Sequence, residues 1–312
     1  MNFYLAPLEG ITTYIYRRNY HKYFSPMDKY FAPFVTSAKL NYKERMDLTL
    51  ENNPDAVIVP QVMSKHAEEF LSMAETMASL GYHTVNLNLG CPSGTVVAKG
   101  RGAGMLASPE ALDQFLDQIF SQSPIKISLK TRIGISDPEE WEALIPIYQK
   151  YPVEELIIHP RLQKDFYKGV PRMDAFAAAV SSIQAPLCYN GDISSVSDYQ
   201  TLVQTCPALD RVMIGRGVLK NPALLAQIRQ EPLPTKDTIR SFHDDIFQEY
   251  RERMSGDRPA LCKMIELWTY LKDGFTNPEN YMKKIRKSKH CSDYLLAVDA
   301  LFKNEDYQIP KP

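Results

Sequence analysis

The sequence predicts an α/β fold, a (β/α)8 TIM barrel followed by a C-terminal all-helical domain. Short apolar runs and helical patterns alternate through about the first 230 residues, which is the size of such a barrel. Most of the runs are continuously apolar, as parallel strands covered on both faces should be. A doubly wound open sheet is the alternative. Its glycine fingerprint should follow the first strand, where Pro7-Leu-Glu-Gly10 stands instead.

Eight segments have the length and composition of buried strands. They are Asn2–Ala6, Lys29–Pro33, Ala56–Val62, Thr84–Leu89, Ile125–Lys130, Glu155–His159, Pro186–Tyr189 and Arg211–Ile214. Helical patterns fall between them. The clearest are His66–Leu80, Pro109–Phe120, Pro138–Lys150, Met173–Ser182, Ser197–Thr205 and Pro222–Gln230.

The pattern changes after the proline-containing linker Glu231-Pro-Leu-Pro234. Four helical stretches follow, with no convincing strand among them. They are Lys236–Met254, Ala260–Lys272, Pro278–Lys289 and Ser292–Phe302. We expect a barrel domain over residues 1–231 and a small helical bundle over residues 235–312.

Composition excludes several classes of protein. The 312 residues are 44% hydrophobic and 23% charged, as in an ordinary globular protein, and no stretch is apolar enough to span a bilayer. The start of the chain lacks a signal-peptide pattern, and five scattered cysteines without a CxxC pair argue against a disulfide framework or structural zinc. We expect a cytoplasmic protein without a metal. A net charge of −1 means that any nucleic-acid affinity must come from local patches.

The stretch from Asn86 to Pro92 is the most informative part of the chain. An apolar-rich strand ends abruptly in Gly90, and Pro92 cannot continue it. Cys91 is thereby exposed at the tip of a strand, where barrels hold their chemistry. The other four cysteines are expected to be small buried side chains. As a thiolate Cys91 could attack a substrate, and as a thiol it could donate a proton.

Polar, cationic and glycine residues stand at other predicted strand ends. In chain order they include Glu9, Gln61, Asn88, Lys130, Arg132, His159, Arg161, Asn190, Asp192 and Arg216. Lys130 could form a Schiff base or remain a cation that stabilises an anion such as a reduced flavin, and the polar surroundings favour the cation. Gly191 and Gly215 with Arg216 have the pattern of a phosphate-binding cup.

Six motifs together resemble the tRNA-dihydrouridine synthase family of flavoenzymes, in its order and spacing. They are Ala6-Pro-Leu-Glu-Gly10, Asn86-Leu-Asn-Leu-Gly-Cys-Pro92, Leu129-Lys-Thr-Arg-Ile-Gly134, His159-Pro-Arg161 with Tyr167-Lys-Gly169, Asn190-Gly-Asp192 and Val212-Met-Ile-Gly-Arg-Gly217. The helical tail fits more loosely, through Lys263-Met-Ile-Glu-Leu-Trp-Thr-Tyr-Leu271. Pro160 and Leu162 depart from the pattern, because family members commonly carry glycine and threonine there, and Leu8 stands where methionine is frequent.

The resemblance implies an FMN-containing barrel that reduces particular uridines of tRNA to 5,6-dihydrouridine, with NADPH recharging the flavin. It assigns cofactor contacts to Pro7, Leu8, Glu9, Gln61, Lys130, His159, Asn190, Gly191, Asp192, Gly215 and Arg216. It places Asn88, Arg132 and Tyr167 facing the uracil. Hydride from flavin N5 would reach C6, and Cys91 would give C5 its proton as a general acid. The target base would have to be flipped out of the folded RNA.

The tail adds an argument for RNA binding. Five cations lie within seven residues, namely Lys283, Lys284, Arg286, Lys287 and Lys289. We expect the first four to contact tRNA phosphates, although a solvated basic helix is the alternative. Trp268 and Tyr270 are expected to lie in the core rather than to stack on bases. We expect tRNA as the partner, with neither a membrane nor a protein partner, and family precedent favours a monomer.

Three other functions fit parts of the sequence. An FMN barrel acting on a free pyrimidine or another small conjugated substrate would not need the cationic helical tail. A Schiff-base aldolase built on Lys130 leaves Cys91 without a purpose. A non-catalytic RNA-binding protein would need neither the cysteine nor the phosphate-cup residues.

Overall fold

The computed structural model describes residues 1–309, and its nine strands form one parallel sheet. The strands are β1 (Asn2–Leu5), β2 (Lys29–Phe31), β3 (Ile58–Val59), β4 (Gln61–Val62), β5 (Thr84–Leu89), β6 (Lys126–Arg132), β7 (Leu156–His159), β8 (Leu187–Tyr189) and β9 (Arg211–Ile214). Their spatial order is β3-β2-β1-β9-β8-β7-β6-β5-β4.

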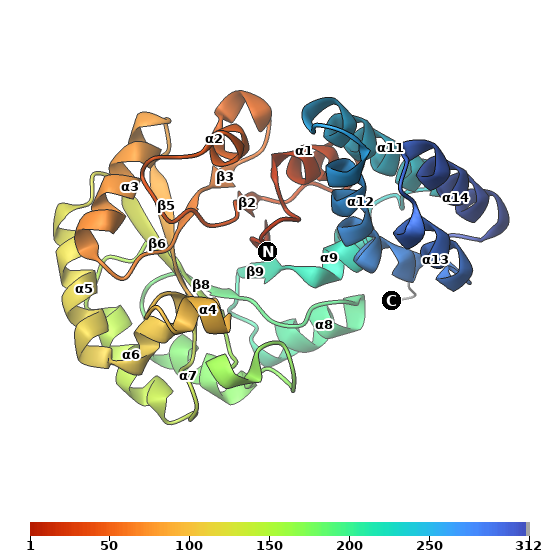
Figure 1. Cartoon of the computed structure of the whole chain (residues 1–312). Coiled ribbons are helices and arrows are strands. Elements are labelled where there is room, and N and C mark those ends of the chain that lie inside the picture. The colour runs from red at the N-terminus through yellow and green to blue at the C-terminus, as the bar shows by residue number, and fades with distance from the viewer. Residues whose placement is uncertain (310–312) are drawn as a thin grey trace. The chain divides into compact units, whose positions relative to one another are not determined.

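The sheet closes into a barrel because β3 and β4 are two halves of one strand, interrupted at Pro60. The first half pairs with β2 and the second with β5, so the two ends of the strand order meet. An isolated bridge between Val35 and Val62 strengthens this closure. The predicted (β/α)8 barrel is therefore confirmed, and C-terminal helices follow it in the chain (Figure 1).

Helices alternate with the strands along the barrel, and further helices follow the last strand. They are α1 (Tyr14–Tyr23), α2 (Tyr42–Leu48), α3 (Ala67–Ser79), α4 (Gly94–Val97), α5 (Pro109–Gln122), α6 (Glu140–Gln149), α7 (Met173–Ser182), α8 (Val196–Thr205), α9 (Arg216–Lys220), α10 (Leu224–Arg229), α11 (Lys236–Arg253), α12 (Asp257–Leu271), α13 (Glu279–Lys287) and α14 (Cys291–Asn304). Short 3₁₀ turns span Leu50–Asn52, Gly102–Ala107, Gln163–Asp165 and Lys272–Gly274.

Helix α1 is not predicted from the sequence pattern. Four of its ten residues are tyrosines, and one asparagine and one histidine accompany them, all of them weak helix formers. The helix nevertheless forms, with Tyr16 and Tyr20 buried. Packing of these rings therefore outweighs the poor intrinsic propensity of the segment.

Strand β6 is longer than predicted and ends at Arg132 rather than at Lys130. Both cations accordingly lie within the strand. Because side chains alternate along a strand, Ser128, Lys130 and Arg132 share one face. The opposite face carries Thr131, whose hydroxyl bonds the Tyr148 hydroxyl of α6 at 2.9 Å.

The chain forms two compact units, each assembled from separate segments. One comprises residues 1–7, 28–192 and 206–214, and it contains every strand with helices α2 to α7. The other comprises residues 8–27, 193–205 and the chain from Gly215 onward. The linear domain boundary expected at residues 231–235 stays a prediction.

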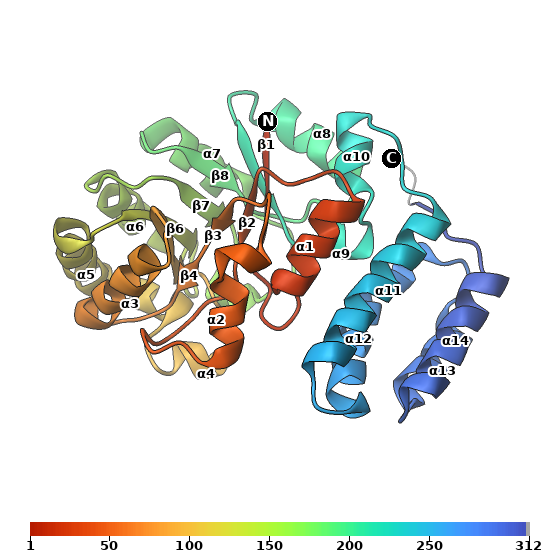
Figure 2. The same ribbon diagram turned by 90° about the horizontal axis from the view of Figure 1, so that it is seen from above.

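In the first unit, helices α3, α5, α6 and α7 cover the outside of the strands (Figure 2). Each contributes large apolar side chains that are fully or almost fully buried, among them Phe70, Leu116, Leu144 and Phe176. The strands are buried on both faces, which explains their continuous apolar runs.

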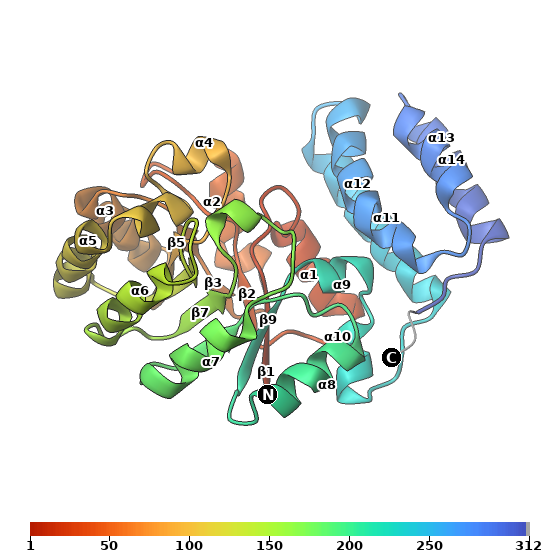
Figure 3. The same cartoon turned by 90° about the horizontal axis from the view of Figure 1, so that it is seen from below.

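In the second unit, helices α11 to α14 lie side by side (Figure 3), and α11 also packs against α1. Their core contains the indole of Trp268, which donates to the Tyr294 hydroxyl at 2.8 Å. That hydroxyl also bonds His243 Nε2 at 2.5 Å. The burial of Trp268 confirms its expected core position, while Tyr270 is partly exposed. Among the described residues, none of the helices has the length and apolar character needed to cross a membrane.

Candidate active site

Strand register gathers the polar side chains of the first unit at the carboxyl edge of the barrel. Asn88 on β5 is paired with Lys130 on β6, and Arg132 is paired with His159 on β7. Four residues predicted separately from sequence therefore lie on three adjacent strands. We call Gln61, Asn88, Cys91, Lys130, Arg132, His159 and Arg161 the rim cluster.

A chain of buried amides runs across three strands beneath the rim. Gln61 Nε2 donates to Asn86 Oδ1, and Asn86 Nδ2 donates to Ser128 Oγ, each at 2.8 Å. Asn88 Nδ2 donates to Gln61 Oε1, also at 2.8 Å. The sequence-based site omits Asn86 and Ser128. Alternation of Asn86, Leu87 and Asn88 is the signal that marks a polar inner face on this strand.

Asn88 fixes the backbone around the candidate catalytic thiol. Its Oδ1 accepts from the amides of Gly90 at 3.0 Å and Cys91 at 2.9 Å. Cys91 is partly exposed, as expected, and its carbonyl accepts from Ala103 N at 3.1 Å. Gly102 has φ +56, and a Cβ there would approach the Cys91 Cβ to 3.0 Å. Glycine is therefore required at residue 102 for the segment Lys99-Gly-Arg-Gly-Ala-Gly104 to pack on the cysteine.

Arg132 joins two loops of the rim. Its Nε donates to Gly90 O at 2.9 Å, Nη1 to Leu162 O at 2.8 Å, and Nη2 to Phe166 O at 2.6 Å. The guanidinium is 1% exposed and lies 5.5 Å from the ring centroid of Tyr167. Arg132 thus connects the loop before Cys91 with the loop after β7. These hydrogen bonds occupy the guanidinium with backbone carbonyls.

A second buried arginine orders the other side of the β7 loop, residues 160–172. Arg161 is fully buried and pairs with both carboxylate oxygens of Asp192, at 3.1 and 2.5 Å. Its Nη1 also lies 2.9 Å from His159 Nε2, which must accept because a guanidinium can only donate. Arg161 Nη2 and Nε donate to the carbonyls of Gly169 and Lys168. Sequence motifs include Arg161 but assign it no role.

Lys130 has a different environment from the two arginines. Its side chain is partly buried, and within residues 1–309 its ammonium makes neither a hydrogen bond nor an ion pair. Burial, reinforced by the nearby Arg132 charge, lowers the pKa of Lys130 to about 8. A cation in this position is available to a bound acceptor or anion.

The remaining predicted cofactor residues lie near strand ends but are divided between the units. Asn190 follows β8, and its Nδ2 donates to Met213 O at 2.9 Å. A side chain on Gly191 would collide with the Tyr189 ring. Pro7 belongs to the first unit, as do Asn190, Gly191 and Asp192.

Leu8 and Glu9, like Gly215 and Arg216, belong to the second unit. The Leu8 amide donates to Thr12 Oγ1 at 2.8 Å, so this turn is ordered by its own chain. The Gly10 carbonyl, in the same turn, accepts from Lys263 Nζ of α12 at 2.7 Å. Arg216 begins α9 directly after β9 and Gly215.

The predicted tRNA-contacting cations occupy one exposed side of α13. Met282 and Ile285 are fully buried, whereas the four cations are exposed. In the described chain, these four side chains form no hydrogen bond or ion pair. They are Lys283, Lys284, Arg286 and Lys287. The helix is therefore amphipathic, with a cationic face that is not used internally.

The expectation that the other cysteines are buried holds for three of the four. Cys188, Cys206 and Cys291 are buried, but Cys262 is exposed on α12. The expectation for Cys262 was wrong because the apolar face of this helix is formed by Leu261, Met264 and Trp268 instead. None of the five cysteines, all of which lie in the described residues, forms a disulfide.

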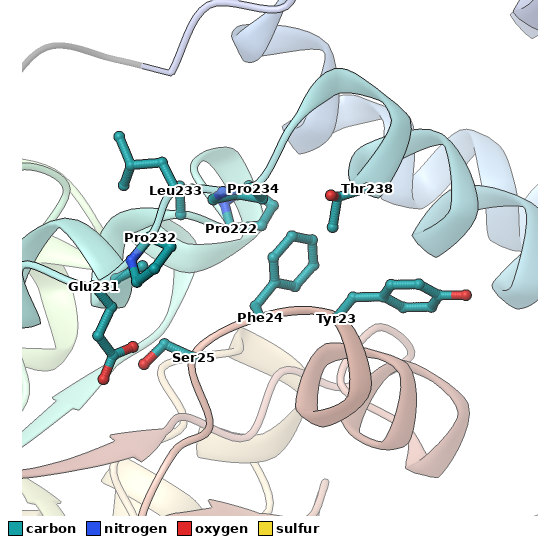
Figure 4. Close-up of a pocket in the computed structure, with 11 residues that line it drawn as sticks. Tyr23, Phe24, Ser25, Pro222, Glu231, Pro232, Leu233, Pro234 and Thr238 are labelled. Carbon is teal, nitrogen blue, oxygen red and sulfur yellow. The ribbon is translucent and has the colours of Figure 1, made fainter.

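A pocket of about 290 Å³ occurs elsewhere, within the second unit. It lies between the end of α1, the start of α10 and the proline-containing linker, with Phe24, Pro222 and Pro234 in its wall (Figure 4). Neither the rim cluster nor any other residue predicted for the site lines it. Its wall mixes apolar side chains with Ser25, Glu231 and Thr238, and it contains none of the cationic or thiol groups of the rim cluster.

Comparison with known proteins agrees with the motifs. The family model described as dihydrouridine synthase matches residues 4–305. A probable tRNA-dihydrouridine synthase 2 of Bacillus subtilis is 26% identical, over 95% of this chain and 93% of its own length. Probable tRNA-dihydrouridine synthases of Staphylococcus epidermidis and Staphylococcus aureus are 28% and 26% identical, over 85% and 80% of this chain and 84% and 78% of their own lengths.

Proposed function

Because this chain belongs to the dihydrouridine synthase family, we propose that it reduces specific uridines of tRNA to 5,6-dihydrouridine, with FMN as cofactor and NADPH as reductant. The observation that carries the proposal is the rim cluster. It combines a partly exposed thiol on a fixed loop with an ammonium that lacks a partner among the described residues. Relatives named for tRNA support the choice of substrate.

The residues present suit a flavin. An isoalloxazine ring has carbonyl and nitrogen acceptors along one edge, and it becomes anionic when reduced. Lys130 offers a cation that has no competing partner in the described part of the chain, and the Gln61 amide keeps one N–H beyond its bond to Asn86. We assign both residues to the polar edge, Pro7, Leu8 and Glu9 to the ring, and His159 beside it.

The phosphate end is assigned to the residues after β8 and β9. Asn190, Gly191, Gly215 and Arg216 supply amides and one cation. Asp192 carries a negative charge, so its role toward a phosphate is indirect. It holds Arg161, and through that guanidinium it fixes the acceptor nitrogen of His159.

FMN, when bound, would supply the hydride that adds to C6 of the uracil, and NADPH would restore it. The chain must then give C5 a proton. Cys91 would donate the proton from its Sγ, leaving a thiolate that solvent reprotonates. Asn88 holds the Cys91 amide and Arg132 holds the preceding carbonyl, so both would orient the donor. Tyr167 would face the flipped base beside Arg132.

The α13 cations favour tRNA over a free pyrimidine. A small substrate gains nothing from four exposed cations that form no pairs within residues 1–309, whereas an RNA backbone does. Lys283, Lys284, Arg286 and Lys287 are proposed to contact phosphates on tRNA.

The proposal is tested with purified protein and tRNA that lacks dihydrouridine. The protein should be yellow, its flavin absorbance should bleach with NADPH, and mass spectrometry should find two hydrogens added to a uridine. Cys91→Ala should keep the bleaching and lose product formation by about 100-fold or more. Cys262→Ala, at another accessible thiol, is the matched control.

Two outcomes would reject parts of the proposal. A colourless protein that cannot be reconstituted with FMN excludes the flavin. Wild-type product formation by Cys91→Ala excludes the proton donor while leaving the flavin assignment standing.

A further inference from the structure

Phe166 is the most unusual residue of the β7 loop. Its backbone has φ +51, a conformation that L-residues rarely adopt and that glycine adopts easily. Its side chain is 44% exposed, and among the described residues the ring stacks on neither another ring nor a cation. The chain thus carries backbone strain to display an aromatic ring to solvent. Strain of this kind is typical of functional segments.

The position of Phe166 relative to Cys91 is fixed by two separate ties. One Arg132 guanidinium binds both the Phe166 carbonyl and the Gly90 carbonyl, which precedes the cysteine. Gln163 Nε2 donates to Pro92 O, directly after the cysteine, at 3.0 Å. The segment that presents the ring is therefore bound to both sides of the candidate proton donor.

The surroundings of the ring have the composition of an RNA contact. Tyr167 and Val170 are 55% and 83% exposed, so apolar surface extends along the loop. Lys164 and Lys168 are exposed, and within residues 1–309 their ammonium groups form no ion pair. Aromatic rings interleaved with cations bind bases and phosphates together.

We infer that Phe166 is a wedge that stacks on the nucleotide next to the target uridine and fills the gap left when that base is flipped out. The inference rests on the proposed function. Extruding a base costs stacking energy, and proteins that unstack nucleic acids insert apolar side chains to offset it. Tyr167 is less suited to this task, because its ring lies beside Arg132 and 6.4 Å from the His159 ring.

The first test separates function from folding. Phe166→Gly removes the ring and also relieves the strained φ, so its melting temperature should equal or exceed that of the wild type. Its kcat/KM on a folded tRNA transcript should nevertheless fall between about 5-fold and 100-fold, the range expected when one base stack is removed. Phe166→Tyr keeps a ring and should stay near wild type. Tyr42→Ala removes another exposed aromatic side chain, on α2, and is the control.

The second test asks what the ring touches. The same transcript is prepared with an abasic nucleotide on the 5′ or the 3′ side of the uridine that the wild type reduces. If Phe166 stacks on that neighbour, the penalty of Phe166→Gly should vanish on one of the two abasic substrates. A penalty that persists unchanged on both overturns the wedge, as does wild-type kcat/KM for Phe166→Gly. A wild-type protein that reduces no uridine would instead overturn the proposed function itself.

Discussion

Lys130, which we propose as the cation at the flavin edge, lies where its charge lowers the stability of the fold. Its ammonium is partly removed from water, close to the Arg132 charge, and it lacks a partner among residues 1–309. A pKa of about 8 means that the folded chain holds this proton less tightly than an unfolded chain does, where lysine has a pKa of about 10.4. The charge that we propose for flavin stabilisation therefore destabilises the cofactor-free protein.

The corresponding prediction concerns Lys130→Met in the cofactor-free protein. Below pH 8 the variant should be more stable than the wild type by up to about 3 kcal/mol, reduced by solvent screening because the residue is partly exposed. Between pH 8 and about 10.4 the unfolded wild type binds more protons than the folded one, so wild-type stability rises and the difference shrinks. Urea unfolding of both proteins at pH 7 and pH 10 measures this difference in the free energy of unfolding.

Lys126→Met, at an exposed lysine on the same strand, is the control and should show no such pH-dependent gain. If Lys130→Met is less stable than the wild type at pH 7, the Lys130 ammonium makes favourable interactions in the folded protein and the prediction is wrong. The same variant should lose flavin-dependent activity, which is the usual cost of stabilising a functional site.

At the scale of elements, the rim is built by loops that hold one another. The loop after β5 carries Cys91, the loop after β7 carries Phe166 and Tyr167, and Arg132 on the intervening strand binds both. At these positions the two loops contain only local turns, such as the one closed by the Phe166 amide donating to Gln163 O, and no strand or α-helix. We therefore expect the two loops to open together when the guanidinium is removed.

Arg132→Lys tests this coupling. An ammonium cannot reproduce three hydrogen bonds in a planar fork, so buried carbonyls lose their donors and stability should fall by about 3 kcal/mol. Hydrogen exchange should rise at Gly90 and Cys91 and in residues 162–168 together. Arg172→Lys alters a partly exposed arginine that pairs with Asp165 in the second loop, and it should raise exchange there alone. Independent behaviour of the two loops in Arg132→Lys would contradict the coupling.

The sequence predicts elements better than it predicts these hydrogen bonds. The apolar-rich run Thr84–Leu89, ended by a glycine, identifies strand β5, and its two asparagines lie on the face that carries the buried amide chain. The end of β6 is missed because Lys130 and Arg132 look like loop residues, although they face the polar interior of the barrel. Helix α1 is missed because its stability comes from packed tyrosines rather than from propensity.

In the candidate site, too, the positions of residues are predicted better than their hydrogen bonds. Sequence motifs identify Cys91, Lys130 and His159, because the ends of buried strands can be predicted from the sequence. The motifs do not predict that Arg132 donates to the carbonyl of Phe166, because every residue type has a backbone carbonyl. The motifs also do not predict the positive φ at Phe166, because a positive φ is expected at glycine and this residue is a phenylalanine.

At the scale of the whole molecule, charge is balanced overall but not locally. A net charge of −1 over 312 residues gives no general attraction to a polyanion. The four cations of α13 are exposed on one side of an amphipathic helix whose other side is buried. If tRNA is the substrate, this helix should account for a measurable share of the salt dependence of binding.

Replacing Lys283, Lys284, Arg286 and Lys287 by glutamine tests that share. Removing one phosphate-binding cation should reduce the slope of log Kd against log salt by about 0.7 to 0.9, so the full variant should flatten it by up to about 3 units. Filter binding of one tRNA from low to moderate salt measures the slope. The control is a double variant, Lys43→Gln plus Lys303→Gln, which removes two exposed cations from α2 and α14. It is compared with the double variant Lys283→Gln plus Lys287→Gln on α13. Equal slopes for these two double variants would identify the α13 cations as ordinary solvated surface, and tRNA would then have to be held by other parts of the chain.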